Sequence, residues 1–300
     1  MVLPFDKSPF MRKPGESGVM LAPDGSIFHL RLRPGDIAPL ILLVGDPGRV
    51  TAISRYFDRV ELERQNREFR THTGWIGKQR LSVVSTGIGT DNIDIVIQEL
   101  DALFNLDLRL GNPLEQTISL RIVRLGTSGG IPEDLQPDSQ ILSAYALGLD
   151  LLMHFYRTRP NKKELDLLDA LTRHLGNDFG EPYLFGGSET LLERFSREGW
   201  AAGITVTCPG FFGPQGRRLR IPLTHPDLIS RFQSFRYAGL QVMNLEMESS
   251  GIYGLGRALG HECLSISTVI VNRATGAVSG DVPGAMDRMI SRSLEILCAP

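Results

Sequence analysis

The strongest constraint on the fold is a series of short apolar runs that carry little charge and end at glycines or arginines. The run from Cys263 to Val271 contains no charged residue, which predicts a strand covered on both faces, as in a parallel sheet. Similar runs span 39–44, 81–86, 118–125, 139–145 and 201–207. Because such strands need helices on both faces, the sequence predicts an α/β fold.

Amphipathic segments between these runs supply the helices. Ile252, Leu255 and Leu259 fall at the i, i+3 and i+7 spacing of one buried helix face. Gly260 stands where a left-handed helix cap requires a glycine. Residues 93–104, 160–175 and 226–238 carry similar patterns, whereas 177–199 is polar and ambiguous. Strands and helices therefore alternate along most of the chain.

Length and composition favour one folded domain. The 300 residues, of which 42% are hydrophobic, suffice for one large α/β core or two smaller ones, and no linker divides the chain. Residues 1–26 are rich in Pro, Gly and charge and carry no periodicity, so we expect an extended arm there. The folded domain is expected to span 27–300.

Charge and cysteine content exclude several classes of protein. A net charge of −2 and a pI of about 6.3 give no reason to bind nucleic acid. We find neither a secretory leader nor an apolar run of bilayer length. The three cysteines are too widely spaced for a disulfide framework or a zinc site. We therefore expect a cytoplasmic protein without a metal.

Two glycine-rich segments with an arginine follow predicted strands and suit an anion. Gly45 to Arg49 combines a tight turn, which exposes backbone N–H groups, with a fixed cation. Arg124 precedes the hydroxyls and glycines of 126–130, which we interpret as a second turn. Ordinary solvated turns are the alternative for each segment alone. Gly87 and Gly89 match only half of a dinucleotide fingerprint, because the third glycine is missing.

Carboxylates and a polar loop suggest sites for a sugar and a base. Glu246 and Glu248 precede a helix, and a carboxylate there can accept hydrogen bonds from two adjacent hydroxyls. The loop 208–217 displays two aromatic rings with Gln215 and Arg217, which match the face and the polar edge of a pyrimidine. Alternatively, at least one of Phe211 and Phe212 is a core plug beneath a surface loop.

The ordered set of motifs resembles the nucleoside phosphorylases of the hexameric purine and uridine type. The motifs are Gly-Asp-Pro-Gly-Arg-Val (45–50), Arg-Glu-Phe (67–69), Ser-Thr-Gly-Ile-Gly (85–89), Arg-Leu-Gly-Thr-Ser-Gly-Gly (124–130), Phe-Phe-Gly-Pro-Gln-Gly-Arg (211–217), Glu-Met-Glu-Ser (246–249) and Val-Ile-Val-Asn-Arg (269–273). The resemblance implies a single three-layer α/β/α domain around a mixed, partly barrel-like twisted sheet.

The resemblance also implies a role for each site residue. Phosphate would be held by Gly45, Arg49, Arg67, Arg124 and Thr127; ribose by His29, Met247 and Glu248; and the base by Phe211, Gln215, Arg217, Ile270, Val271 and Arg273. Arg124, Glu248, Gln215 and Arg217 would carry the catalysis. His29 and Arg67 would come from a neighbouring subunit, which requires at least a homodimer and leaves a hexamer open.

The implied reaction is phosphorolysis of a pyrimidine nucleoside, with uridine as the expected substrate and phosphate as co-substrate. No cofactor is implied beyond a monovalent cation at a subunit interface, for which Glu68 would be the ligand.

Purine-cleaving relatives place an aspartate after the last strand, whereas this chain has no carboxylate between Val269 and Asp281. The Gly213-Pro214 order departs from the bacterial pattern. A purine nucleoside phosphorylase, a nucleosidase, a non-catalytic relative and a dinucleotide-dependent oxidoreductase remain as alternatives.

Overall fold

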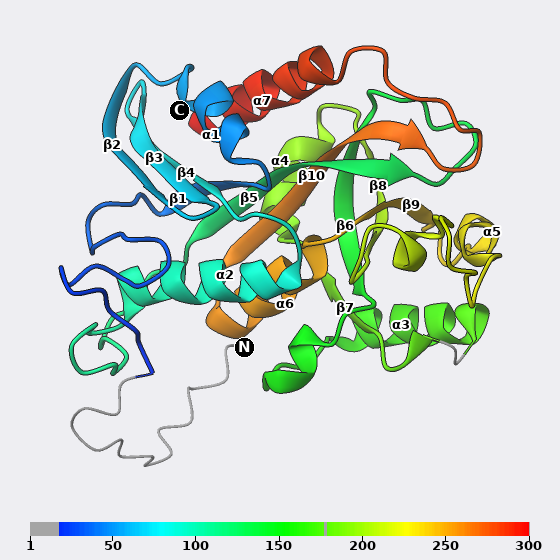
Figure 1. The fold of residues 1–300 in the computed structure, drawn as a ribbon, viewed down its shortest axis with the longest axis horizontal. Coiled ribbons are helices and arrows are strands. Elements are labelled where there is room, and N and C mark those ends of the chain that lie inside the picture. The colour runs from blue at the N-terminus through cyan, green and yellow to red at the C-terminus, as the bar shows by residue number, and fades with distance from the viewer. Residues whose placement is uncertain (1–17, 177–178, 300) are drawn as a thin grey trace.

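A computed structural model describes residues 18–176 and 179–299 of the chain (Figure 1). Most of the predicted arm, and residues 177–178 of the ambiguous segment, lie outside this range. The strands are β1 (Leu40–Val44), β2 (Arg59–Asn66), β3 (Phe69–Ile76), β4 (Gln79–Ser85), β5 (Arg121–Gly130), β6 (Gln140–Gly148), β7 (Tyr183–Gly186), β8 (Ala201–Thr207), β9 (Val242–Glu246) and β10 (Glu262–Asn272). The helices are α1 (Pro47–Ser54), α2 (Thr90–Asn105), α3 (Lys162–Leu175), α4 (Glu189–Ser196), α5 (Leu228–Ser234), α6 (Ser249–Leu259) and α7 (Val282–Cys298).

Half of the sheet closes on itself. The strand order β10-β6-β8-β9-β5 is completed by a second pairing between β5 and β10, so these strands form a small barrel. From β5 the sheet continues as an open wing through β1, β4, β3 and β2. Pairing is mixed, since β1 and β10 run parallel to β5 while β9 runs antiparallel to it. The predicted α/β class with a mixed, partly barrel-like sheet is confirmed.

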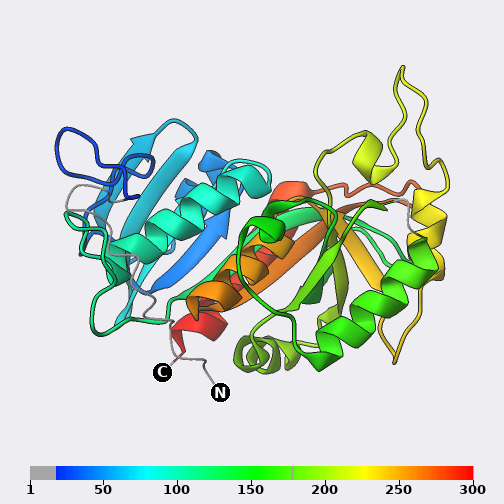
Figure 2. The same cartoon turned by 90° about the horizontal axis from the view of Figure 1, so that it is seen from below.

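Helices cover both faces of the sheet, which explains why its strands lack alternation. On β1, Ile41 and Leu43 pack into a core with α2 and α6, whereas Leu40, Leu42 and Val44 pack into a second core with α1, α4 and α7. Figures 1 and 2 show α2 and α6 on one side of the sheet and α7 on the other. Both faces of each central strand are therefore buried. Among the described residues, no helix combines the length and apolar character needed to cross a bilayer.

Most predicted elements match the structure, and one differs in a way that matters for the site. The strand at 263–271 is confirmed as β10, and Gly260 caps α6 with a left-handed φ of 78°. The turn predicted at 126–130 is wrong, because β5 continues as a strand to Gly130. Pairing with β10 extends to Asn272 opposite Gly130, and β9 joins on the other side at Gly129.

Candidate active site

The C-terminal ends of β1, β4, β5, β9 and β10 surround a cavity of about 550 Å³. Ligands of open α/β sheets bind at this edge, because side chains from several loops meet there. The predicted site residues that line the cavity are Gly45, Arg49, Arg124, Thr127, Phe211, Gln215, Arg217, Met247, Glu248, Ile270 and Val271. The fold thus brings together segments that lie more than two hundred residues apart in the chain.

Three predicted residues lie outside the cavity lining. Arg67 sits exposed in the turn between β2 and β3, with a positive φ of 52°. His29 contacts Glu99, with 2.7 Å between its Nδ1 and the Glu99 Oε1. Arg273 follows β10 beside Gly129, and its Nη1 is buried without a hydrogen-bond partner among the described residues. Within a single chain, therefore, His29 and Arg67 do not reach the other site residues.

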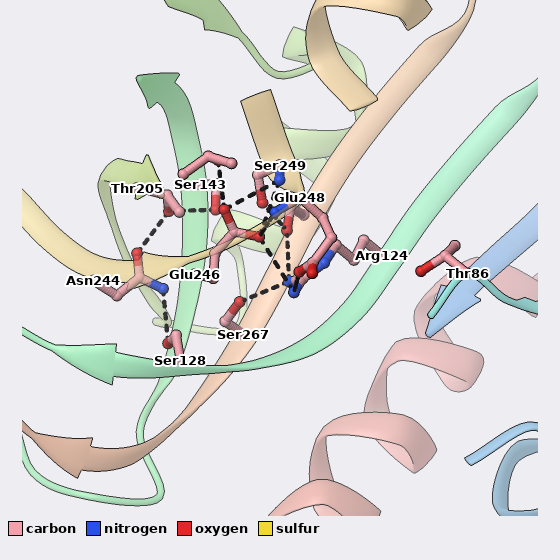
Figure 3. Close-up of polar contacts among 12 residues, drawn as sticks. Thr86, Arg124, Ser128, Ser143, Thr205, Asn244, Glu246, Glu248, Ser249 and Ser267 are labelled. Carbon is pink, nitrogen blue, oxygen red and sulfur yellow. Dashed lines mark hydrogen bonds and ion pairs between the residues drawn. The ribbon is translucent and has the colours of Figure 1, made fainter. Parts of the chain in front are cut away.

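Arg124 is the buried centre of the site. It is 6% exposed, and its Nη2 lies 2.5 Å from the Glu248 Oε2 and 3.2 Å from the Glu246 Oε2 (Figure 3). Its Nη1 donates to the Ser267 hydroxyl at 3.2 Å. Burial alone would lower the pKa of Arg124, but the two carboxylates outweigh it and raise the pKa above its ordinary value. The guanidinium therefore carries a permanent, fixed charge.

Gly126 makes room for this guanidinium. A Cβ at position 126 would fall well inside contact distance of the Arg124 Nη1 and Cζ. The glycines of the 124–130 motif therefore do not mark a turn here; Gly126 serves close packing of an arginine against the strand.

The two carboxylates have different partners. Glu246 accepts a hydrogen bond from the Thr207 hydroxyl at 2.6 Å and further hydrogen bonds from the N–H groups of Glu248 and Ser249. It therefore connects β8 to the start of α6. Glu248 instead accepts the N–H of Gly89 at 2.8 Å beside the cavity. Burial raises the pKa of Glu246, while Arg124 opposes that rise. Both carboxylates line the cavity, but Glu246 is bonded to β8 and the start of α6, whereas Glu248 keeps further acceptor capacity.

A second cation lies close to the first. Arg49 is in the first turn of α1, whose N-cap Asp46 accepts the N–H of Gly48 at 2.8 Å, as predicted for a tight turn after β1. Burial lowers the pKa of Arg49 and the charge of Arg124 lowers it further, while the carboxylates of Asp46 and Glu248 oppose this shift. Two guanidinium groups that repel each other across a cavity favour an anion between them. Thr127 adds a hydroxyl beside them in the cavity lining.

The loop between β8 and α5 forms the other end of the cavity. Arg217 stacks on Phe211, with 3.8 Å from its Cζ to the ring centroid, and donates to the Gln215 Oε1 at 2.6 Å. Burial and the nearby charge of Arg273 lower the pKa of Arg217 to about 10, so it stays charged at neutral pH. Phe211 and Phe212 are each 51% exposed, so the alternative that one is a core plug is wrong. Phe212 lines an adjoining cavity of about 930 Å³.

Sequence reasoning missed some contributors to the site. The Gly89 N–H on Glu248 and the Glu246 tie to Thr207 join distant segments, so no local pattern indicates them. Ser128 lies in the cavity lining beside Thr127, and only its place in the 124–130 motif pointed to it. Among the described residues, no group of three or more His, Cys, Asp or Glu side chains is arranged to hold a metal ion. The Glu68 carboxylate accepts a hydrogen bond from Asn92 at 3.3 Å.

The family model described as the phosphorylase superfamily matches residues 39–299. The chain belongs to the phosphorylase superfamily. It is 29% identical over 258 residues to a uridine phosphorylase of Thermococcus kodakarensis, covering 84% of this chain and 79% of that relative. It is also 26% identical over 270 residues to a DeoD-type purine nucleoside phosphorylase of an Exiguobacterium species, covering 89% and 96%.

A solved structure of this superfamily has the same fold. The crystal structure of a Trypanosoma brucei nucleoside phosphorylase, described as showing uridine phosphorylase activity, matches with a TM-score of 0.87 and 27% identity. The match covers 94% of this chain and 100% of the other. The similar proteins include both a uridine phosphorylase and a purine nucleoside phosphorylase, so the similarity alone does not identify the base.

Proposed function

We propose that this chain is a pentosyltransferase that cleaves a pyrimidine nucleoside by phosphorolysis, converting uridine and phosphate to uracil and ribose 1-phosphate. One observation carries the proposal: a single cavity joins two guanidinium groups, a carboxylate beside them, and an aromatic face with an amide and a third guanidinium. These groups match the phosphate, the ribose and the base in the order in which a nucleoside and its attacking phosphate would lie.

The phosphate would bind at the end formed by Arg49 and Arg124, with the Gly45 backbone and the Thr127 hydroxyl beside them. Its dianion offsets the repulsion between the two cations. Because Arg124 is held by Glu246 and Glu248, the anion meets a guanidinium that is already oriented. Such preorganisation supplies positioning and electrostatic stabilisation without a nucleophilic side chain.

Bond breaking would follow at the ribose. A phosphate oxygen attacks C1′ as the N-glycosidic bond breaks, and the bonding electron pair leaves with the base. Positive charge develops on the sugar, as in glycoside hydrolysis. Glu248 would accept a hydrogen bond from the ribose 2′-hydroxyl, while Met247 packs on the ribose. Gln215 and Arg217 would bind the oxygens of the departing base. The other base contacts would be the Phe211 ring, the wall of Ile270 and Val271, and Arg273 acting indirectly.

By the resemblance, the purine alternative requires an aspartate at the end of β10 that faces the purine ring nitrogen. Asn272 is the polar residue at this place, but its Nδ2 donates to the carbonyls of Pro132 and Leu135. Its Oδ1 accepts the N–H groups of Ala274 and Thr275. Both ends of the Asn272 amide are thus bonded to backbone groups, and a pyrimidine remains the better fit.

Assembly would complete the site. His29 and Arg67 lie away from the cavity of their own chain, so we propose that a homodimer brings them to the partner's ribose and phosphate. Glu99 holds the His29 Nδ1 and the N–H groups of His29 and Leu30, which leaves the Nε2 to meet the ribose 5′-hydroxyl. Assembly into hexamers, an interface cation at Glu68 and a cytoplasmic location remain predictions.

The test is release of free base from uridine, thymidine and inosine, each with and without phosphate. We expect uracil from uridine only when phosphate is present, with ribose 1-phosphate as the second product. Base release without phosphate would indicate a nucleosidase. Faster cleavage of inosine than of uridine would refute the pyrimidine preference. If no base is released from any nucleoside, the proposal that this chain is a nucleoside phosphorylase would be refuted.

A further inference from the structure

Four polar side chains on strands of the barrel form a chain of hydrogen bonds (Figure 3), and its last member, Ser128, lines the cavity. Ser143 of β6 lies 2.5 Å from Thr205 of β8, which donates at 2.6 Å to Asn244 of β9. Asn244 donates at 2.9 Å to Ser128 of β5. Ser143, Thr205 and Asn244 are fully buried. These bonds link four neighbouring strands of the barrel.

With the Asn244 amide oriented as in the structure, its oxygen towards Thr205 and its nitrogen towards Ser128, the direction of every hydrogen bond in this chain follows. An amide oxygen can only accept, so the single proton of Thr205 goes to the Asn244 Oδ1. Ser143 must then donate to Thr205. The Asn244 Nδ2 can only donate, so the Ser128 oxygen accepts and Ser128 keeps its own proton. Among the described residues, no protein atom accepts that proton.

The position of Ser128 shows which part of a ligand it would meet. Ser128 lines the cavity and pairs with Val269 of β10, next to the place where Val271 lies opposite Gly129. The wall formed by Ile270 and Val271 therefore begins beside it. In the arrangement proposed above, this wall contacts the base. A hydroxyl that can only donate suits a carbonyl oxygen, which a pyrimidine base presents.

We propose that Asn244 is a positioning residue that keeps the Ser128 hydroxyl free to donate to a carbonyl oxygen of the base. The inference rests on the proposed function and adds a specificity device to it. A turned amide would reverse the whole chain, since Ser128 would then donate to the Asn244 oxygen and offer only lone pairs to the ligand. If the polar chain only filled the barrel interior, its members would affect stability and not substrate binding.

A double-mutant cycle separates these roles. Asn244→Asp provides two accepting oxygens, so the Ser128 proton is drawn away from the cavity. We expect Ser128→Ala and Asn244→Asp each to lower kcat/KM for uridine about tenfold, with the KM for phosphate almost unchanged. The double variant should match Ser128→Ala alone, because Asn244 acts only through Ser128. The proposal would be overturned if the double variant lost the product of the two single losses in kcat/KM, or if Asn244→Asp left kcat/KM unchanged.

Two further variants serve as a control and as a substitute in this experiment. Ser143→Ala cuts the far end and leaves the Thr205–Asn244–Ser128 bonds in place, so kcat/KM should stay within about twofold. Where Asn244→Asp fails to fold, Thr205→Val removes the proton that holds the amide, and the same cycle is measured with it. Thermal melting checks that each variant is folded. An unmodified chain that releases no base would refute the proposed function, whereas multiplying losses in an active enzyme would refute only the role of Asn244.

Discussion

The two ends of the cavity are built in different ways. Around Arg124, the site consists of barrel side chains that are 3–6% exposed and bonded across strands, with Glu246 joined to both β8 and α6. At the base end, Arg217 bonds to Phe211 and Gln215, residues at most six positions away, and Phe211 is half exposed. The fold therefore fixes the phosphate end, whereas a local loop fixes Arg217, Phe211 and Gln215 at the base end.

Because the two ends are built differently, we expect changes at each end to have different effects on activity and stability. A change at the phosphate end disturbs buried charges, so it should reduce stability together with activity. A change in the loop touches residues that contact one another, so it should alter use of the nucleoside and leave the fold intact.

The largest effect is expected for Arg124→Ala. It removes the cation and leaves Glu246 and Glu248 buried without their charge partner. We expect a loss of about 10³-fold in kcat/KM and a free energy of unfolding lower by about 3 kcal/mol. Steady-state phosphorolysis and urea unfolding measure the two quantities.

Arg121→Ala is the matched control on the same strand. Arg121 lies 3.7 Å from Glu262, and both side chains are about 40% exposed, so a loss below about 1 kcal/mol is expected. Near-normal activity of Arg124→Ala would contradict the assignment of the anion site.

A smaller but sharper effect is expected for Gly126→Ala. The new Cβ must displace the Arg124 guanidinium, although Arg124 and its partners Glu246 and Glu248 all keep their charges. We expect a loss of about 10²-fold in kcat/KM from misplacement alone, measured with saturating nucleoside and varied phosphate. Gly280→Ala is the control, since a Cβ there meets no atom within 4 Å. Equal activity of the two variants would show that the position of Arg124 does not matter.

The sequence predicted the elements that have a local signal. A continuous apolar run predicted β10, helical spacing with a terminal glycine predicted α6, and the ordered motifs predicted the fold. The hairpin of β2 and β3 has only a weak sequence signal, because β2 is mostly exposed and carries two apolar residues, Val60 and Leu62, among charged and polar ones. The predicted end of β5 is too early, because Gly126, which makes room for Arg124, belongs to a glycine-rich segment whose composition favours a turn.

For the site, the sequence predicted residue types better than partners. Arg49, Arg124, Gln215 and Glu248 were named and do meet in one cavity, although their roles remain predictions. The bond between Asn244 and Ser128 joins residues 116 positions apart, and only closure of the barrel brings them together.

At the base end, Arg217→Ala should affect the nucleoside alone. It removes the group that stacks on Phe211 and bonds to Gln215. We expect kcat/KM for uridine to fall about tenfold, with little change in the KM for phosphate or the melting temperature. The exposed neighbour Arg218 provides the control, and Arg218→Ala should behave as the unmodified chain. A large loss of stability in Arg217→Ala would remove the distinction between the two ends.

The smallest effect concerns the two exposed phenylalanines. Phe211 lines the cavity with Arg124, whereas Phe212 lines the adjoining one. Phe211→Ala should raise the KM for uridine about fivefold through loss of stacking, while Phe212→Ala should change it less than about twofold. Initial rates over a range of uridine concentrations distinguish them. The reverse order would place the base in the larger cavity.

The most direct measurement is a crystal structure of the protein with bound phosphate. We predict an oxyanion within hydrogen-bond distance of both Arg49 and Arg124, beside Thr127, with Glu248 still bonded to Arg124. A structure in which the two guanidinium groups point into separate regions, with no oxyanion between them, would contradict the account.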